Sequence, residues 1–227
     1  MPRANDVPGA QAWVPDRPTL STLHEAVQEC RGCDLYRDAT QAVMGSGAAD
    51  ATVMLLGEQP GDKEDIAGEP FVGPAGKLLD RALADAGIEP DDTYVTNAVK
   101  HFRFSGRRGK QRIHKSPSRA QVLACEPWLV AELEVVRPRG VVILGGTAGK
   151  AVYGPDFKVG EQRGRLLEWP AGGHGVPVLP EWVLATVHPS AVLRSRDREE
   201  AYAAFVADLH VVVGALAGAP GESTQRS

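Results

Sequence analysis

Long apolar runs and a secretion signal are both absent from this sequence of 227 residues. No stretch of about 18 consecutive apolar residues occurs, which is the length that a membrane-spanning helix requires. The first residues lack the charged and then apolar pattern of a secretion signal. We therefore expect a cytoplasmic protein with no membrane contact. Its length and its 43% hydrophobic content predict one α/β domain, because two full domains would be cramped.

The chain also has few cysteines: Cys30, Cys33 and Cys125. Three cysteines cannot form a complete set of disulfides, and cytoplasmic thiols are more often metal ligands or catalytic groups. Cys30 and Cys33 form a C-x-x-C pair after a predicted helix at residues 19–29. Such a pair binds metal or performs thioredoxin-like redox chemistry. Since no βαβ pattern leads into it, we favour metal binding.

Acidic residues are missing from residues 100–119, although the chain as a whole is acidic. Removing this basic stretch leaves 17 basic against 29 acidic residues. Local positive charge with two flexible glycines suits a surface that contacts the phosphates of a nucleic acid. A solvated loop without a partner is the alternative. The eight cationic side chains are Lys100, Arg103, Arg107, Arg108, Lys110, Arg112, Lys115 and Arg119.

Two glycine-rich segments lack the spacing of nucleotide-binding motifs. Only three residues separate Gly145 from Gly149, and Ala151 occupies the position that Ser or Thr has in a P-loop. Residues 45–50 precede a predicted strand rather than following one, and Asp50 stands where the last glycine would be. The sequence therefore predicts neither a P-loop nor a dinucleotide-binding loop.

Strand-like and helix-like segments alternate along the chain. Short apolar runs bounded by turn residues predict buried strands at 51–57, 93–99, 140–144 and 182–187. Periodic apolar patterns predict helices at 75–86, 116–136 and 198–213. This alternation predicts a three-layer α/β/α fold with a central four-stranded parallel sheet. We expect a single domain at residues 19–213, with flexible segments at 1–18 and 214–227.

Polar side chains follow three of these strands. Glu58, Gln59 and Asp62 come after the first strand, Asn97 ends the second, and His188 follows the fourth. Loops at the carboxyl ends of parallel strands form the ligand crevice of an open α/β sheet, so we expect these groups to meet there. Taken one at a time, each is also consistent with a polar loop or a turn.

Four segments in this order resemble the motifs of the uracil-DNA glycosylase superfamily. They are the G-E-x-P-G loop at 57–61, Phe71, Asn97 and the H-P-S sequence at 188–190. The resemblance implies the glycosylase fold and excision of uracil from DNA. It implies that Phe71 stacks on uracil, that Asn97 reads its O4 and N3 edge, and that His188 donates to O2.

The loop after the first strand has further candidates by the same resemblance. The Glu58 carboxylate would stabilise the positive charge that grows on the sugar. Gln59 is a candidate for catalysis and for uracil binding, and Asp62 is a candidate for catalysis. The catalytic set that the resemblance implies consists of these residues together with His188 and His114.

Within the superfamily, the chain is most similar to the iron-sulfur branch, whose members hold a 4Fe-4S cluster with four cysteines. Cys30, Cys33 and Cys125 match three of these ligands, and His101 stands at the remaining position. Imidazole replaces thiolate in other iron-sulfur centres. The resemblance therefore implies a 4Fe-4S cofactor with these four ligands.

His101, Gln59 and the R-I-H-K-S-P-S sequence at 112–118 are similar to features of the cross-linking subgroup called UdgX. In that subgroup the histidine of R-I-H-K, here His114, becomes attached to the deoxyribose after uracil leaves. Gln59 is expected to position it. The resemblance thus implies an enzyme that acts once and stays bound to its DNA.

The expected partner is uracil-containing DNA, preferably single-stranded, bound by a monomer. Two alternatives stay open: a glycosylase with multiple turnovers in which His114 only contacts DNA, and a non-catalytic iron-sulfur or zinc module that binds DNA. The predicted phosphate contacts are Arg107, Arg108, Lys110, Arg112 and Lys115.

Overall fold

A six-stranded mixed sheet forms the centre of the protein in a computed structural model that describes residues 7–109, 111–170 and 175–218. Four strands are parallel neighbours: β3 (Thr93–Asn97), β2 (Val53–Gly57), β6 (Gly140–Leu144) and β8 (Trp182–Thr186). All residues of β2, β6 and β8 are buried, as expected for strands covered on both faces. Two-residue antiparallel strands, β1 (Ser46–Gly47) and β7 (Leu166–Leu167), close the edges.

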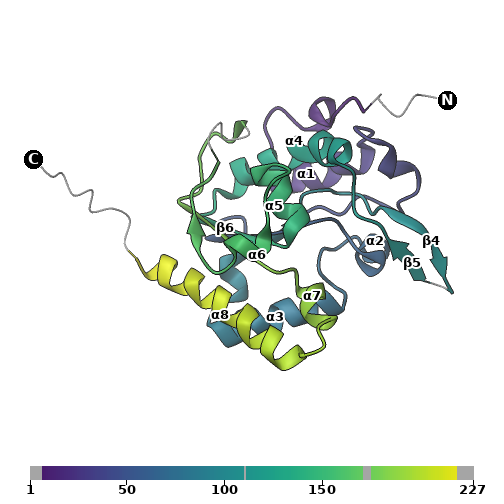
Figure 1. The fold of residues 1–227 in the computed structure, drawn as a ribbon. Helices are drawn as coiled ribbons and strands as arrows, with labels where there is room; N and C mark the ends of the chain where they lie inside the picture. Colours follow the sequence, from purple (N-terminus) through teal and green to yellow (C-terminus); the bar gives the residue numbers. More distant parts are fainter. Residues whose placement is uncertain (1–6, 110, 171–174, 219–227) are drawn as a thin grey trace, which may run out of the picture.

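Helices cover both faces of this sheet (Figure 1). On one face, α3 (Pro74–Ala86), α7 (Pro189–Leu193) and α8 (Arg198–Ala217) pack around buried Leu79, Phe205 and Leu209. On the other face, α4 (Arg119–Val136) and α5 (Gly146–Tyr153) pack around Leu133 and Val152. The prediction of a three-layer α/β/α fold with four central parallel strands is confirmed. The remaining helices are α1 (Leu20–Ala26), α2 (Asp62–Ala67), α6 (Val159–Gln162) and the 3₁₀ turns Gln11–Trp13, Val27–Glu29, Asp34–Arg37 and Pro90–Asp92.

The basic stretch, expected as a loop, forms a β-hairpin. Strands β4 (Phe104–Arg108) and β5 (Gln111–His114) pair in antiparallel register, and Gly106 and Gly109 adopt the positive φ angles that favour glycine. The hairpin extends from the body of the domain beside α2 (Figure 1). A side chain on such a hairpin has a defined orientation that a loose loop would not provide.

Three predicted boundaries differ from the structure. Helix α4 begins at Arg119 with Ser118 as its cap, because Ser118 and Gln121 form a reciprocal capping box, so Pro117 lies outside the helix. Helix α8 continues to Ala217, beyond the predicted end at 213. In the predicted flexible segment 1–18, Ala10 is buried and its amide donates to Ala124 at 2.8 Å. Residues near both predicted boundaries are thus part of the packed domain.

Helix α8 is, among the described residues, long and apolar enough to cross a membrane, with a mean hydropathy of 1.5 over 18 residues. Its inner side packs against α3 and β8. It also contains Asp208, whose carboxylate pairs with Arg163 at 2.8 Å and accepts a hydrogen bond from Thr186 of β8. A helix held to the sheet in this way is an outer layer of the α/β domain.

Candidate functional site

An open pocket lies at the carboxyl ends of the parallel strands. It is lined by six of the predicted site residues, which come from the loop after β2, the loop before α3, the end of β3, the hairpin and the loop after β8. Separate strand ends therefore supply the groups that the sequence analysis expected to meet. The six are Glu58, Gln59, Phe71, Asn97, His114 and His188.

Gly57, the last residue of β2, makes this convergence possible. A Cβ atom here would overlap Asn97 Oδ1, and it would lie 2.7 Å from Cζ of Phe71. The side chains of Asn97 and Phe71 therefore occupy space that only glycine leaves free. Asn97 is 3% exposed, so its amide faces the pocket from a nearly dry position.

Phe71 has a strained backbone. Its φ of 55° lies in the left-handed region, which is uncommon for a bulky residue and often marks a functional position. The next turn is fixed by Glu64, whose Oε1 accepts from the Gly73 amide at 2.7 Å. Gly76 is required as well, because a Cβ there would collide with the Phe71 carbonyl. The Phe71 ring stacks 5.9 Å from the His188 ring.

His188 is held as a neutral donor. Its Nδ1 accepts from the Ser190 amide at 3.1 Å and lies 2.8 Å from the Ser190 hydroxyl at the start of α7. Because a backbone amide can only donate, the proton of the ring is on Nε2. Burial, with smaller contributions from Arg194 and His114, lowers the pKa of His188 to about 4. The imidazole is thus neutral at physiological pH and has one N–H to offer.

Glu58 and His114 face each other across the pocket. Glu58 Oε1 lies 3.5 Å from His114 Nε2, and the two side chains are 18% and 49% exposed. Glu58 Oε1 is buried and has no hydrogen-bond partner among the described residues. A buried carboxylate oxygen without such a partner is available to a cationic or electron-poor group that enters the pocket.

Gln59 fixes the hairpin that carries His114. Its Nε2 donates to the carbonyls of Arg103 and Lys115, each at 3.1 Å, and its Oε1 accepts from the Arg103 amide at 3.0 Å. These bonds reach the residue before β4 and the residue after β5. The amide is therefore committed to the hairpin backbone, which agrees with a positioning role and leaves direct uracil binding without support.

Arg112 and Asp62 differ most from their predicted roles. Arg112 Nε pairs with Asp62 at 2.5 Å, its Nη1 pairs with Asp65 at 2.7 Å, and its guanidinium lies 5.2 Å from the ring centroids of Phe102 and Phe104. The side chain of Arg112 is only 8% exposed. Arg112 is thus engaged inside the domain instead of meeting DNA, and Asp62 anchors the hairpin instead of facing the substrate. Buried partners of this kind satisfy a charge that is costly to desolvate.

The other predicted phosphate contacts are exposed. Arg107 and Arg108 lie on β4 and Lys115 follows β5, and all three side chains are accessible. Lys110 lies outside the described residues. Exposed cations on a hairpin beside the pocket remain the predicted contact for a DNA backbone.

Sequence comparison identifies the protein family. A profile of the Uracil DNA glycosylase superfamily matches residues 44–210, which include Glu58, Phe71, Asn97 and His188. The chain belongs to the uracil-DNA glycosylase superfamily.

The superfamily members most similar in sequence include type-4 uracil-DNA glycosylases. The one from Thermotoga maritima is 34% identical over 181 residues, covering 79% of this chain and 86% of that protein. The one from Archaeoglobus fulgidus is 35% identical over 187 residues, covering 80% and 87%. A type-5 uracil-DNA glycosylase from Pyrobaculum aerophilum is 31% identical over 150 residues, covering 60% and 62%.

The predicted cluster ligands of this superfamily member, three thiols and one imidazole, are all buried. Cys30, Cys33 and Cys125 are free cysteines in one apolar cluster. His101 follows β3 and is 4% exposed. Among the described residues, no group of three His, Cys, Asp or Glu side chains is arranged around a single ion. Each ligand of a cubane cluster binds a different iron atom, so its donors surround the cluster instead of meeting at one point.

The chemistry of this donor set fits an iron-sulfur centre. Burial raises the pKa of the Cys33 thiol to about 11 and that of Cys125 to about 12, so a cation would be needed to hold them as thiolates at neutral pH. Burial lowers the pKa of His101 to about 4, which keeps the imidazole in its neutral, ligating form. Trp128 Nε1 also lies 3.3 Å from Cys30 Sγ, a contact of the kind that stabilises a sulfur ligand.

Two polar groups that support the pocket were missed from the sequence. Glu64 was not singled out, because its partner Gly73 is nine residues away in a loop without a regular pattern. Lys100 was counted with the basic surface, but it is completely buried and pairs with Glu132 of α4 at 2.6 Å. For Lys100, the available signal was a cation shortly after a predicted strand. This signal does not reveal whether the side chain faces solvent or the interior of the protein.

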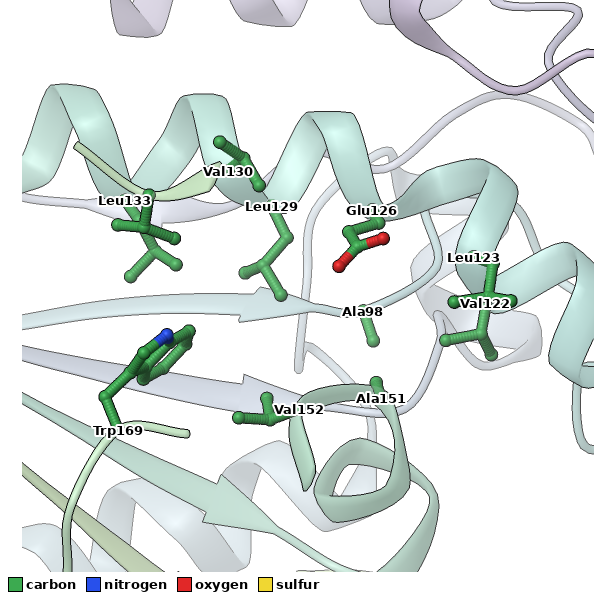
Figure 2. A pocket seen from close by; sticks show the side chains of 11 residues that line it. Ala98, Val122, Leu123, Glu126, Leu129, Val130, Leu133, Ala151, Val152 and Trp169 are labelled. Carbon is green, nitrogen blue, oxygen red and sulfur yellow. The ribbon is translucent and has the colours of Figure 1, made fainter. Parts of the chain in front are cut away.

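A second, apolar cavity lies between α4, α5 and the segment around Trp169 (Figure 2). Figure 2 shows Leu129, Leu133 and Val152 directed into it. None of the described residues with a predicted role in the site lines this cavity. This cavity therefore adds no residue to the predicted site.

Proposed function

We propose that this protein removes uracil from DNA and then becomes covalently linked to the abasic deoxyribose through His114. Excision of uracil for DNA repair rests on membership of the superfamily and on the type-4 and type-5 uracil-DNA glycosylases among its relatives. The cross-link rests on one observation: His114 Nε2 lies 3.5 Å from Glu58 Oε1 in the pocket that contains Asn97 and His188.

Uracil recognition is assigned to Asn97 and Phe71. The Asn97 amide can accept from N3–H and donate to O4 of uracil, a pattern that cytosine reverses. The Phe71 ring would stack on the base, and its strained, fixed backbone supports a defined stacking position. The base must leave the helical stack to reach this pocket, which explains why single-stranded DNA would be the easier substrate.

Breakage of the glycosidic bond uses His188 and Glu58. The bond between C1′ and N1 breaks with its electron pair leaving on uracil, and negative charge gathers on O2. Neutral His188 donates its Nε2–H to that oxygen, while the Glu58 carboxylate stabilises the positive charge on the sugar. The uracil anion then takes a proton from solvent.

Bond formation follows at His114. The lone pair of Nε2 attacks C1′, and the attacking tautomer has its proton on Nδ1. Loss of that proton to solvent leaves a neutral alkylated imidazole, which is a poor leaving group. The adduct therefore persists and each enzyme molecule acts once.

We also propose that Cys30, Cys33, His101 and Cys125 hold a 4Fe-4S cluster. Once bound, the cluster would supply a structural cross-link between the N-terminal segment, the turn after β3 and α4. His101 lies in this turn, four residues after Asn97, the last residue of β3. Iron and sulfide analysis of anaerobically purified protein tests this assignment.

The cross-link is tested with an excess of uracil-containing single-stranded DNA. We expect a protein-DNA adduct that survives denaturation and maps by mass to His114. His114→Ser should form no adduct and should release uracil, because water then completes the reaction. His210→Gln is the matched control, since His210 is exposed on α8 far along the chain from the hairpin, and it should form the adduct normally.

A glycosylase with multiple turnovers is the second candidate, favoured by the names of the type-4 relatives. In this case His114 would contact DNA without attacking it. Free uracil in molar excess over active enzyme would support this candidate and refute the cross-link. The monomeric state and the cytoplasmic location remain predictions from the sequence.

A further inference from the structure

A buried ion pair lies next to Asn97, the residue proposed to read uracil. Lys100 and Glu132 are both completely buried, and Lys100 Nζ lies 2.6 Å from Glu132 Oε2. Glu132 also accepts hydrogen bonds from the Gly45 amide and from the hydroxyls of Tyr94 and Thr96. Taking two charges out of water is costly, and apolar residues of similar volume often replace such pairs without loss of stability. Stability alone therefore does not account for this pair.

The contact that stability does not explain is the one between Lys100 and Asn97. Lys100 Nζ donates to the Asn97 carbonyl at 2.7 Å and to Thr96 Oγ1 at 2.8 Å. The lysine thus closes a turn over residues 97–100 by binding the backbone of the residue proposed to read uracil. A charged donor makes a stronger hydrogen bond than a neutral one, and more so in a dry interior.

The same turn also holds the backbone of Glu58. The amides of Ala98 and Val99 donate to the carbonyls of Gly57 and Glu58, at 2.9 and 3.0 Å. At the other end, the Lys100 amide lies 3.3 Å from Cys125 Sγ, and the Lys100 carbonyl accepts from Val43 at 2.8 Å. The turn is therefore held by backbone bonds at Ala98 and Val99, and by the side chain, amide and carbonyl of Lys100.

We propose that Lys100, with Glu132 as its buried counterion, is a positioning residue that determines uracil specificity by holding Asn97. The inference rests on the proposed function, because it assigns uracil recognition to Asn97. Reading a base edge requires an amide placed to within a fraction of an ångström, and small displacements of a recognition group reduce rates strongly. Lys100 supplies this placement without touching the substrate.

The test removes both charges together. Lys100→Met/Glu132→Gln takes away the donor to Asn97, while the new Gln side chain can still accept from Gly45 and Tyr94. We expect single-turnover uracil release to fall roughly 10- to 100-fold, and inhibition by free uracil to weaken by a similar factor. Affinity for the same strand with thymine in place of uracil should not change, because the phosphate contacts are intact.

A double-mutant cycle with Asn97→Ala separates positioning from a general effect on the fold. If Lys100 acts through Asn97, the paired substitutions should have almost no further effect on uracil release once Asn97 is Ala. Tyr94→Phe is the matched control, since it removes one bond to Glu132 and leaves every contact of Lys100 in place. It should behave as wild type.

Each outcome decides between the alternatives. Additive losses in the cycle, or unchanged uracil inhibition in the paired variant, would overturn the inference. If circular dichroism shows that the paired variant does not fold, Thr96→Val takes its place, because it removes one acceptor of Lys100. This variant should show a smaller decrease in single-turnover uracil release. No decrease would overturn the inference. Wild-type protein that releases no uracil would instead refute the proposed function itself.

Discussion

Replacing Gln59 by Met should separate the loss of uracil from the cross-link to His114. The Gln59 amide makes three hydrogen bonds to the hairpin, to the carbonyls of Arg103 and Lys115 and to the Arg103 amide. Lys115 directly follows His114, so these bonds fix the backbone beside the proposed nucleophile. Met has a similar length and none of these polar groups, so the substitution removes the bonds with little change in volume.

The size of the effect follows from the three bonds. An intramolecular hydrogen bond contributes about 1 kcal/mol net, and a polar group left buried without its partner costs more. Because water reaches the outer side of the hairpin, we take about 1 to 3 kcal/mol for the loss of all three bonds. At about 1.4 kcal/mol per factor of ten, the population of correctly placed His114 should fall roughly 5- to 150-fold.

Rapid quenching with enzyme in excess over a uracil-containing single strand measures both events in the same samples. Free uracil is separated by chromatography, and the adduct is separated on a denaturing gel. We expect uracil release by Gln59→Met to stay close to that of wild type. Adduct formation should slow by the factor above, and abasic DNA should accumulate in between.

Gln28→Met is the matched control. The Gln28 amide binds the backbone of Ala42 in the same way, at 3.0 Å to its carbonyl and 3.1 Å to its amide, and Ala42 lies outside the hairpin. Equal rates of adduct formation in the two variants would refute the reasoning about Gln59. An equal loss of uracil release and adduct formation in Gln59→Met would show that Gln59 acts on the base instead.

Two further predictions concern stability. Burial lowers the pKa of His188 from 6.5 to about 4, so between these values the unfolded chain takes up a proton that the folded chain does not. The free energy of unfolding should therefore fall by up to about 2 kcal/mol between about pH 7.5 and pH 5. Measured by urea titration, the fall in stability over this pH range should be smaller by this amount in His188→Gln than in wild type. An equal fall in the two proteins would contradict the prediction. Arg112→Ala leaves the completely buried Asp65 carboxylate without its ion pair, which should cost about 3 to 5 kcal/mol. The melting temperature, followed by circular dichroism, should then fall by roughly 6 to 20 °C, whereas an unchanged value would show that the pair is not stabilising.

The meeting of Glu58, Asn97 and His188 in one pocket was predictable, because it depends on the order and direction of the strands. Glu58, Asn97 and His188 each follow a strand of a parallel sheet, and β2 lies between β3 and β6 in the strand order. Carboxyl ends of parallel strands meet at one edge, so polar residues that follow them come together whatever the details of the loops. The apolar runs were sufficient to identify the four central strands. The edge strand β1 escaped prediction because two residues are too few to show a period.

The roles within the basic stretch were not predictable, because charge does not reveal burial. Lys100 pairs with Glu132, 32 residues later, and Arg112 pairs with Asp62, 50 residues earlier. Neither distance corresponds to a local pattern of helix or strand. Each cation has the same sequence signature as the exposed Arg107 beside it. Only the packing of α4 and α2 against these segments distinguishes a buried ion pair from a phosphate contact.

The attachments of the hairpin bear on the proposed succession of steps at Glu58 and His114. Gln59 holds both ends of the hairpin, and Asp62 holds Arg112 on β5. Both residues belong to the segment that begins with Glu58, so one loop holds the Glu58 carboxylate and, through the hairpin, the His114 imidazole that are assigned the two steps of the proposed reaction. A displacement of this loop would move both groups together and preserve their separation of 3.5 Å. The position of His114 therefore depends on the G-E-Q-P-G-D loop as much as on the hairpin. If the same hairpin lay beside a loop without Gln59 and Asp62, it would lack the contacts that fix the proposed position of the His114 imidazole over the sugar.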